Sequence, residues 1–169
     1  MNGARQRRQL LIERMQQLEA RGIDCRACVG ECCTSRCNSM LITKVEAEDI
    51  LSYLKRENLW NDEWTARLRA CVREFRLDVE LPSFGSRRNL RRTYTCPFYQ
   101  AGPRGCLLSR EAKPYGCLGF NAVVAGAKGL SDGCQSDQNL LAQQASLHSE
   151  QPPLKAPIPV AILDLLGPN

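Results

Sequence analysis

The chain has 169 residues, of which 43% are hydrophobic and 24% are charged, and this composition fits one globular domain with a modest core. Its formal charge of +5 treats every cysteine as neutral, although metal-bound cysteines are thiolates. A zinc ion held by four thiolates carries a charge of −2, so two such sites would leave the chain near +1. The basic balance is therefore weak support for a polyanionic partner, and we do not expect nucleic-acid binding.

The chain contains ten cysteines. Whether they form disulfides or stay free to bind metal depends on the redox state of the compartment. The N-terminal segment MNGARQRRQLLIERMQQLEARG interrupts every apolar stretch with charge, so it lacks the apolar region of a secretory signal. No apolar run approaches the roughly 20 residues that span a bilayer. We therefore expect a cytoplasmic protein without a membrane segment, and there clustered cysteines favour metal binding over disulfides.

Helical periodicity predicts three helices in the first half of the chain. Residues 5–21 carry a helical apolar stripe that Gly22 ends. A second helix is predicted to start at Thr43, because Glu46 three residues later completes a capping box. A third helix is predicted from Asn61 or Asp62 to about residue 78.

The remaining sequence consists of cysteine-rich and connecting segments. A helical region at about 43–80 separates two cysteine-bearing segments, 25–37 and 96–134. Residues 82–95 are predicted as loop or short strand, 136–148 as a polar helix, and 150–169 as a Pro-rich tail after a metal-binding domain of residues 1–149. We expect a small, mainly α single domain with an irregular Cys-rich, metal-bound centre.

The spacing of the first cysteine cluster, CRACVGECCTSRC, is typical of metal ligands. Cys25 and Cys28 form a C-x2-C pair, which lets one tight turn present two thiolates to one ion. Cys32 and Cys33 follow directly, and adjacent cysteines do not easily face one mononuclear ion. The spacing therefore predicts two neighbouring sites or one polynuclear cluster, with Cys37 left open between ligand and bystander.

The predicted ligands are almost all cysteines, and the predicted metal is zinc or iron, the latter including an iron–sulfur cluster. Cys71 is excluded because it lies on the apolar stripe of the third helix, where a thiol packs as a small hydrophobe. His148, the single histidine, stands in a polar stretch and is predicted on the surface. The predicted ligands are Cys25, Cys28, Cys32, Cys33, Cys96, Cys106, Cys117 and Cys134.

A basic segment, SRRNLRR, supports an alternative nucleic-acid hypothesis. Its arginines are followed by Tyr94, and such a patch could bind phosphates. We favour a solvated loop that balances thiolate charge. The arginines are Arg87, Arg88, Arg91 and Arg92.

Taken together, these motifs resemble the cysteine-cluster proteins described as zinc- or iron-chelating and named for a C-x-x-C-x-x-C-C motif. The resemblance covers roughly residues 25–134 and implies metal chelation by the cysteines. Two departures are that three residues separate Cys28 from Cys32 where the family usually has two, and that Lys113 stands where arginine is usual. The matching residues are Cys25, Cys28, Cys32-Cys33, Cys96-Pro97-Phe98, Gly105-Cys106, Pro114, Cys117 and Phe120.

The sequence leaves four functional hypotheses in a definite order. The first is a metal-ion binding protein in which zinc or iron holds the two cysteine segments together, with no protein partner identified. The second is an iron–sulfur or polynuclear iron protein with a redox or enzymatic role, and the third is metal storage or delivery. A nucleic-acid-binding module comes fourth. Whether the protein is an enzyme is left open, since no motif for acid–base or nucleophilic chemistry is present.

Overall fold

The structure, a computed structural model, describes residues 3–25, 31–79, 81, 91–101, 105–124, 129, 132–147 and 153–167. Most described residues are helical, which confirms the predicted mainly α fold. The described α-helices are α1 (Ala4–Glu19), α2 (Lys44–Arg56), α3 (Asp62–Phe75), α4 (Tyr115–Val124), α6 (Cys134–Ala145) and α7 (Ile158–Leu166), and a 3-10 turn, η1, spans Glu31–Cys33. None of the described helices is long and apolar enough to cross a bilayer.

Two short antiparallel ribbons connect the helices. Strand β1 (Leu41–Thr43) pairs with β4 (Lys155–Pro157), so the C-terminal segment lies beside the start of α2. Strand β2 (Tyr99–Gln100) pairs with β3 (Gly105–Cys106) in a hairpin of the second cysteine segment.

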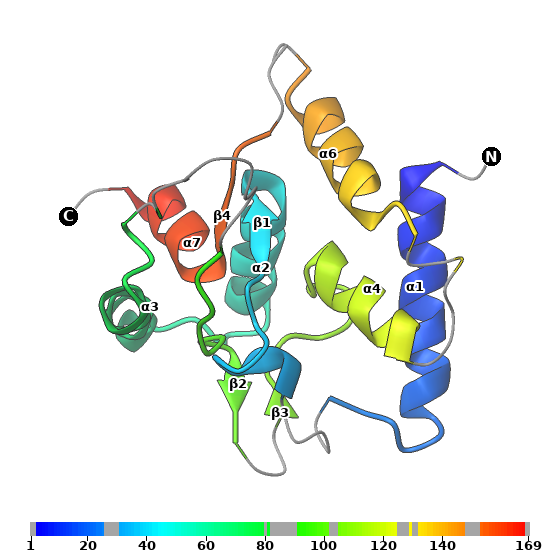
Figure 1. Ribbon diagram of the computed structural model, residues 1–169, viewed down its shortest axis with the longest axis horizontal. Coiled ribbons are helices and arrows are strands. Elements are labelled where there is room, and N and C mark those ends of the chain that lie inside the picture. The colour runs from blue at the N-terminus through cyan, green and yellow to red at the C-terminus, as the bar shows by residue number, and fades with distance from the viewer. Residues whose placement is uncertain are drawn as a thin grey trace.

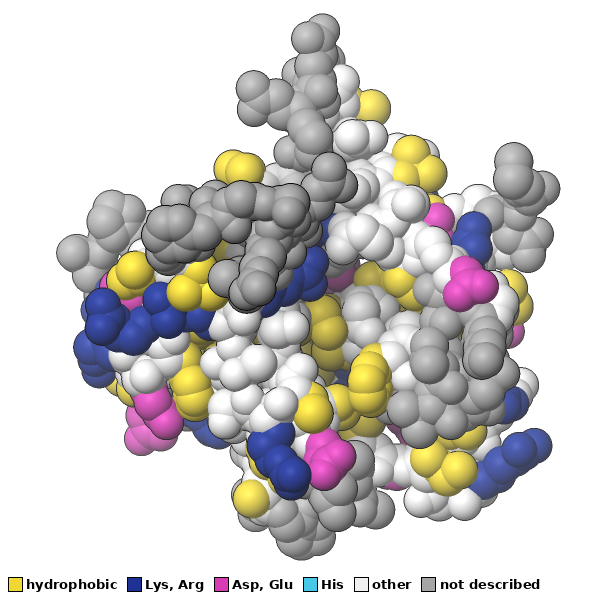
Figure 2. All heavy atoms as spheres, viewed as in Figure 1, with side chains coloured by type: hydrophobic (Ala, Val, Ile, Leu, Met, Phe, Trp, Pro, Cys, Tyr) yellow, Lys and Arg dark blue, Asp and Glu magenta, His cyan; other side chains and the backbone are white. Residues whose placement is uncertain are grey.

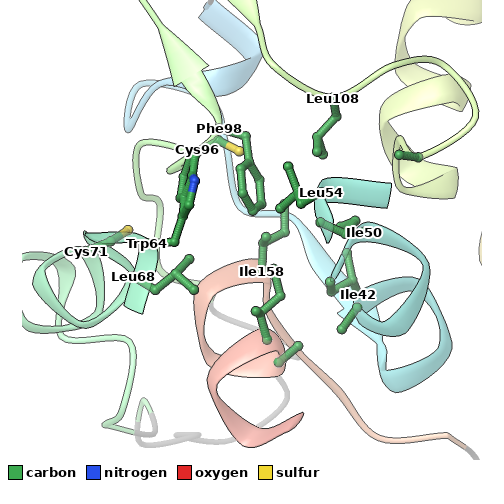
Figure 3. Packing of buried hydrophobic residues seen from close by; sticks show 14 of the residues in the cluster. Ile42, Ile50, Leu54, Trp64, Leu68, Cys71, Cys96, Phe98, Leu108 and Ile158 are labelled. Carbon is green, nitrogen blue, oxygen red and sulfur yellow. The ribbon is translucent and has the colours of Figure 1, made fainter. Parts of the chain in front are cut away.

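The larger hydrophobic core lies between α2, α3 and α7 (Figure 1). Ile50 and Leu54 of α2, Leu68 of α3 and Ile162 of α7 are all fully buried. Figure 3 shows the Trp64 ring beside Phe98, with a centroid distance of 5.1 Å. The C-terminal segment thus supplies one side of this core, although its opening residues read as a Pro-rich tail.

The second hydrophobic core is much smaller and lies among α1, α4 and α6, the group that stands apart on the right of Figure 1. Four buried side chains form it, namely Leu11 and Met15 of α1 with Tyr115 and Leu118 of α4. These three helices have 16, 10 and 12 residues. Units of about 40 residues or fewer usually need a metal, a disulfide or a partner to stay folded.

The predicted start of α2 is confirmed, and the predicted end of α3 differs slightly from the observed one. Thr43 caps α2, and the predicted capping box with Glu46 is present. Helix α3 ends at Phe75, three residues before the predicted end, because Arg76 adopts a left-handed conformation with φ of 53°. Helix α4 was not predicted, because its sequence YGCLGFNAVV has two glycines and is apolar throughout, without helical alternation.

Helix α4 approaches the first half of the chain closely at Gly116. A Cβ atom on Gly116 would lie 2.6 Å from the Met40 sulfur, so a side chain there would displace Met40. Glycine therefore allows α4 to pack against the segment that precedes β1.

A buried carboxylate, Glu46, links the two cores. Besides its capping-box bonds, it accepts hydrogen bonds from the backbone N–H of Tyr115 (2.8 Å) and from the Gln138 side chain. One side chain of α2 therefore binds the start of α4 and the middle of α6. Glu46 is only 7% exposed. If its carboxylate were removed, the groups that donate hydrogen bonds to it would have no water to bond to instead.

Replacing Glu46 by alanine is expected to lower the free energy of unfolding by about 3 kcal/mol, because it leaves buried donors unsatisfied and removes a helix cap. Glu48→Ala is the matched control, since Glu48 lies exposed on the same helix and only contacts Lys44 at 4.0 Å. That control is expected to change the free energy by less than about 0.5 kcal/mol. Urea unfolding of the three proteins measures both effects, and equal midpoints would contradict the role of Glu46.

Candidate metal centre

A single cavity between the two cores collects nearly all the cysteines that the structure describes. Its volume is about 310 Å³. Figure 2 shows the molecular surface hollowed between the two groups of helices, with hydrophobic side chains, a class that includes cysteine, inside the hollow. Eight of the nine described cysteines line this cavity: Cys25, Cys32, Cys33, Cys37, Cys96, Cys106, Cys117 and Cys134. We call it the cysteine cavity.

The larger core carries the cysteines of one wall. Cys96 belongs to that core, and Cys33 and Cys106 pack against it. The backbone N–H of Cys96 donates to the carbonyl of Cys33 at 2.7 Å, and that of Tyr94 donates to the carbonyl of Asn38 at 2.9 Å. These bonds fix the segment with η1 beside the strand-like residues 94–96.

The β2–β3 hairpin positions Cys106. Tyr99 and Cys106 are paired across the two strands, and Leu107 donates its N–H to the carbonyl of Phe98 at 2.9 Å. Because Phe98 is fully buried against Trp64, the hairpin is anchored in the larger core (Figure 3). Cys96 and Cys106 are thus held on a rigid element ten residues apart in the chain.

The smaller core carries the cysteines of the opposite wall. Cys117 lies in the first turn of α4, whose N-terminus is held by Glu46. Cys134 opens α6 and packs against the smaller core, and Cys25, six residues after the end of α1, lines the same cavity. The cysteine cavity therefore brings together thiols from both halves of the molecule.

The adjacent thiols Cys32 and Cys33 interact directly, with their sulfur atoms 3.9 Å apart. The hydrogen bond from Cys33 lowers the pKa of Cys32 to about 6, although burial opposes this shift. The same bond, with burial and the negative charges of Cys32 and Cys96, raises the pKa of Cys33. At neutral pH the pair therefore holds one thiolate that its neighbour stabilises.

The deeper thiols of the cysteine cavity resist ionisation. Burial, followed by the charge of Cys106, raises the pKa of Cys96 to about 12. Burial also raises the pKa of Cys117, and the nearby charge of Lys113 only partly offsets this effect. These groups therefore stay neutral unless a cation replaces their protons, and metal binding at such thiols releases protons.

Lys113 is the one buried cation among the described residues that line the cysteine cavity, and it is only 4% exposed. Burial alone lowers its pKa, but the ionised forms of Cys106, Cys25 and Cys117 and a hydrogen bond to Cys106 together outweigh burial and raise the pKa overall. The sequence provided only a weak indication that this residue belongs to the site, namely its position four residues before Cys117.

The donor chemistry of the cysteine cavity fits a soft metal ion. Among its described lining residues there is no histidine, aspartate or glutamate, so sulfur is the only ionisable donor type. Thiolates of this kind suit zinc and iron–sulfur centres. Within the described ranges, no three such side chains are gathered tightly enough to hold an ion, so the thiols would have to draw together on binding.

The other predicted residues are distributed as follows. Cys71 lies in the larger core beside Leu68, as predicted, and its thiol donates to the Thr95 carbonyl at 3.4 Å (Figure 3). Cys37 lines the cavity but is exposed. Cys28, Arg87, Arg88 and His148 lie outside the described residues.

The aromatic residue of the basic segment is not available for stacking. Tyr94 is fully buried, and its hydroxyl donates to the Met40 carbonyl at 2.7 Å and accepts from the Ile158 N–H at 3.0 Å. Tyr94 therefore joins the larger core to α7. The nucleic-acid hypothesis therefore rests on the arginines alone.

Comparison with known proteins adds no relative to this description. No protein family, curated protein or solved structure matches the chain significantly. The arguments for function therefore rest on the residues and the geometry of the cysteine cavity.

The buried thiol of Cys71 makes the stability of the protein depend on pH. Burial raises the pKa of Cys71 from 9.0 to about 11, so the folded state holds this proton more tightly than the unfolded state. Its contribution to stability is full below pH 9 and is lost as the pH rises through 11. The difference in unfolding free energy between wild type and Cys71→Ala should therefore be constant up to pH 9 and shrink above it. A difference that grows above pH 9 would contradict the assignment.

Proposed function

We propose that this chain is a metal-ion binding protein that chelates zinc or iron through clustered cysteine thiolates. The observation that supports this is the cavity that eight cysteines share, while the ninth described cysteine packs in the core. Random placement of cysteines in a helical domain would not separate them this way. The proposed ligands are drawn from Cys25, Cys28, Cys32, Cys33, Cys96, Cys106, Cys117 and Cys134.

The proposed role of the metal is to join the two hydrophobic cores. One wall of the cysteine cavity belongs to the larger core and the other to the smaller core. Structural zinc contributes about 10–16 kcal/mol of apparent binding free energy in zinc-finger peptides, which matches or exceeds the roughly 6–12 kcal/mol that burial of four apolar side chains provides. Reduced thiols are required for this role, which favours the cytoplasm as the compartment.

A polynuclear iron or iron–sulfur centre is the second candidate, and one observation favours it. The charges of Cys32, Cys96 and Cys106 raise the pKa values of both Cys33 and Cys117. Five thiols therefore share one electrostatic neighbourhood, one more than a four-thiolate mononuclear ion uses.

Elemental analysis and a visible spectrum of protein purified without oxygen test the proposal. Zinc without visible absorption supports a closed scaffold, whereas iron with acid-labile sulfide supports the polynuclear alternative. Protein that is folded yet binds neither metal, as purified or after addition of Zn²⁺ or Fe²⁺, contradicts the proposal.

The ligand set is tested by two matched cysteine variants. Cys117→Ser is expected to lose metal and solubility, because Cys117 belongs to the wall of the smaller core. Cys71→Ala is the control and is expected to keep the full metal content while losing about 1 kcal/mol of stability. Metal content per chain is the readout, and equal content in wild type and Cys117→Ser would exclude Cys117 as a ligand.

A further inference from the structure

We propose that Lys113 is a positioning residue of the metal centre, whose ammonium group hydrogen-bonds a metal-bound thiolate and lowers the negative charge of the centre. This inference rests on the proposed metal binding and adds a residue that is not itself a ligand. A sulfur-only centre accumulates negative charge, because four thiolates around one zinc ion leave −2. Burying that charge is costly unless a cation is buried with it.

Lys113 is the buried cation that such a centre requires, because it lies among several of the cysteines. It lines the cysteine cavity together with Cys106 and Cys117, and it also lines an adjoining cavity of about 180 Å³ next to Cys25. Thiols of the hairpin, of α4 and of the segment after α1 line these two cavities with it. The adjoining cavity also holds the carboxylates of Glu19 and Asp24, whereas no carboxylate is among the described residues of the cysteine cavity, where the thiols are the acidic groups that this lysine faces.

The backbone holds Lys113 in place from both sides. Its N–H donates to the Ser109 carbonyl at 3.0 Å, and its carbonyl accepts a hydrogen bond from the Arg8 guanidinium at 3.0 Å. The following residue, Pro114, is buried and leads directly into α4. The side chain therefore starts from a fixed point between the two walls of the cavity.

A buried lysine could also serve stability alone, by packing its carbon chain against Leu108. The two roles differ in what they change. A packing role affects the unfolding of the protein, whereas a hydrogen bond to a metal-bound sulfur also changes the electronic spectrum of the centre and the affinity for metal. Partners outside the first shell typically contribute 10- to 100-fold in metal affinity.

The test uses Co²⁺ as a spectroscopic probe and Zn²⁺ in chelator competition, on wild type and three variants. Lys113→Met is expected to weaken Zn²⁺ binding 10- to 100-fold and to shift the thiolate-to-cobalt charge-transfer band. Lys113→Arg, which keeps the charge and the donors, is expected to recover most of the affinity. Lys155→Met is the matched control, because Lys155 lies half-buried on β4 and does not line the cysteine cavity.

The outcomes separate this inference from the proposed function. If wild type binds neither Co²⁺ nor Zn²⁺, the proposed function fails. If wild type binds and Lys113→Met binds equally tightly with an unchanged band, the inference about Lys113 is wrong. Should Lys113→Met not fold, Lys113→Gln replaces it, since that change keeps a donor and removes the charge, and unaltered affinity there would also overturn the inference.

Discussion

The arrangement of two hydrophobic cores of unequal size around a thiol-lined cavity governs the rest of the structure. The larger core of α2, α3 and α7 is well filled, while the smaller one relies on Leu11, Met15, Tyr115 and Leu118. Glu46 provides a polar link between the two through Tyr115 and Gln138. One buried carboxylate is a weak link between the larger core and the three helices of the smaller core. Thiols of both cores line the cavity, and a metal ion bound by them would link the cores more strongly.

The ionisation of the cysteine cavity is expected to change when a cation binds. Burial keeps Cys96 and Cys117 protonated, the Cys32–Cys33 pair holds one stabilised thiolate, and Lys113 offsets negative charge from the middle of the group. A divalent ion would exchange for the protons of the deeper thiols. Binding through these residues is therefore expected to couple to pH and to the packing of both cores.

Local signals in the sequence predicted much of the helical structure. The Thr43 and Glu46 capping box and the apolar stripe of α3, including buried Cys71, are features of neighbouring residues and could be recognised from spacing. Helix α4 could not, because its apolar sequence with Gly116 and Gly119 has no amphipathic period, and its position depends on long-range contacts with Glu46 and Met40. The left-handed Arg76 that shortens α3 likewise carries no sequence signal.

The candidate site was only partly predictable, for the same reason. Spacing identified the cysteines as a group, but it did not reveal that Cys117 and Cys134, on helices of the smaller core, line one cavity with the cysteines of the larger core. Nor did it reveal that Glu46 has a second role beyond capping α2. Both features arise from how distant segments pack. The role of Lys113 can likewise be inferred only when its neighbours in space are known.

Hydrogen–deuterium exchange before and after metal removal by a chelator tests the central claim most directly. If a metal in the cysteine cavity joins the two cores, amides of α1, α4 and α6 should lose protection on removal, while those of α2, α3 and α7 keep it. Unchanged exchange in all six helices, with metal loss verified by elemental analysis, would contradict the account.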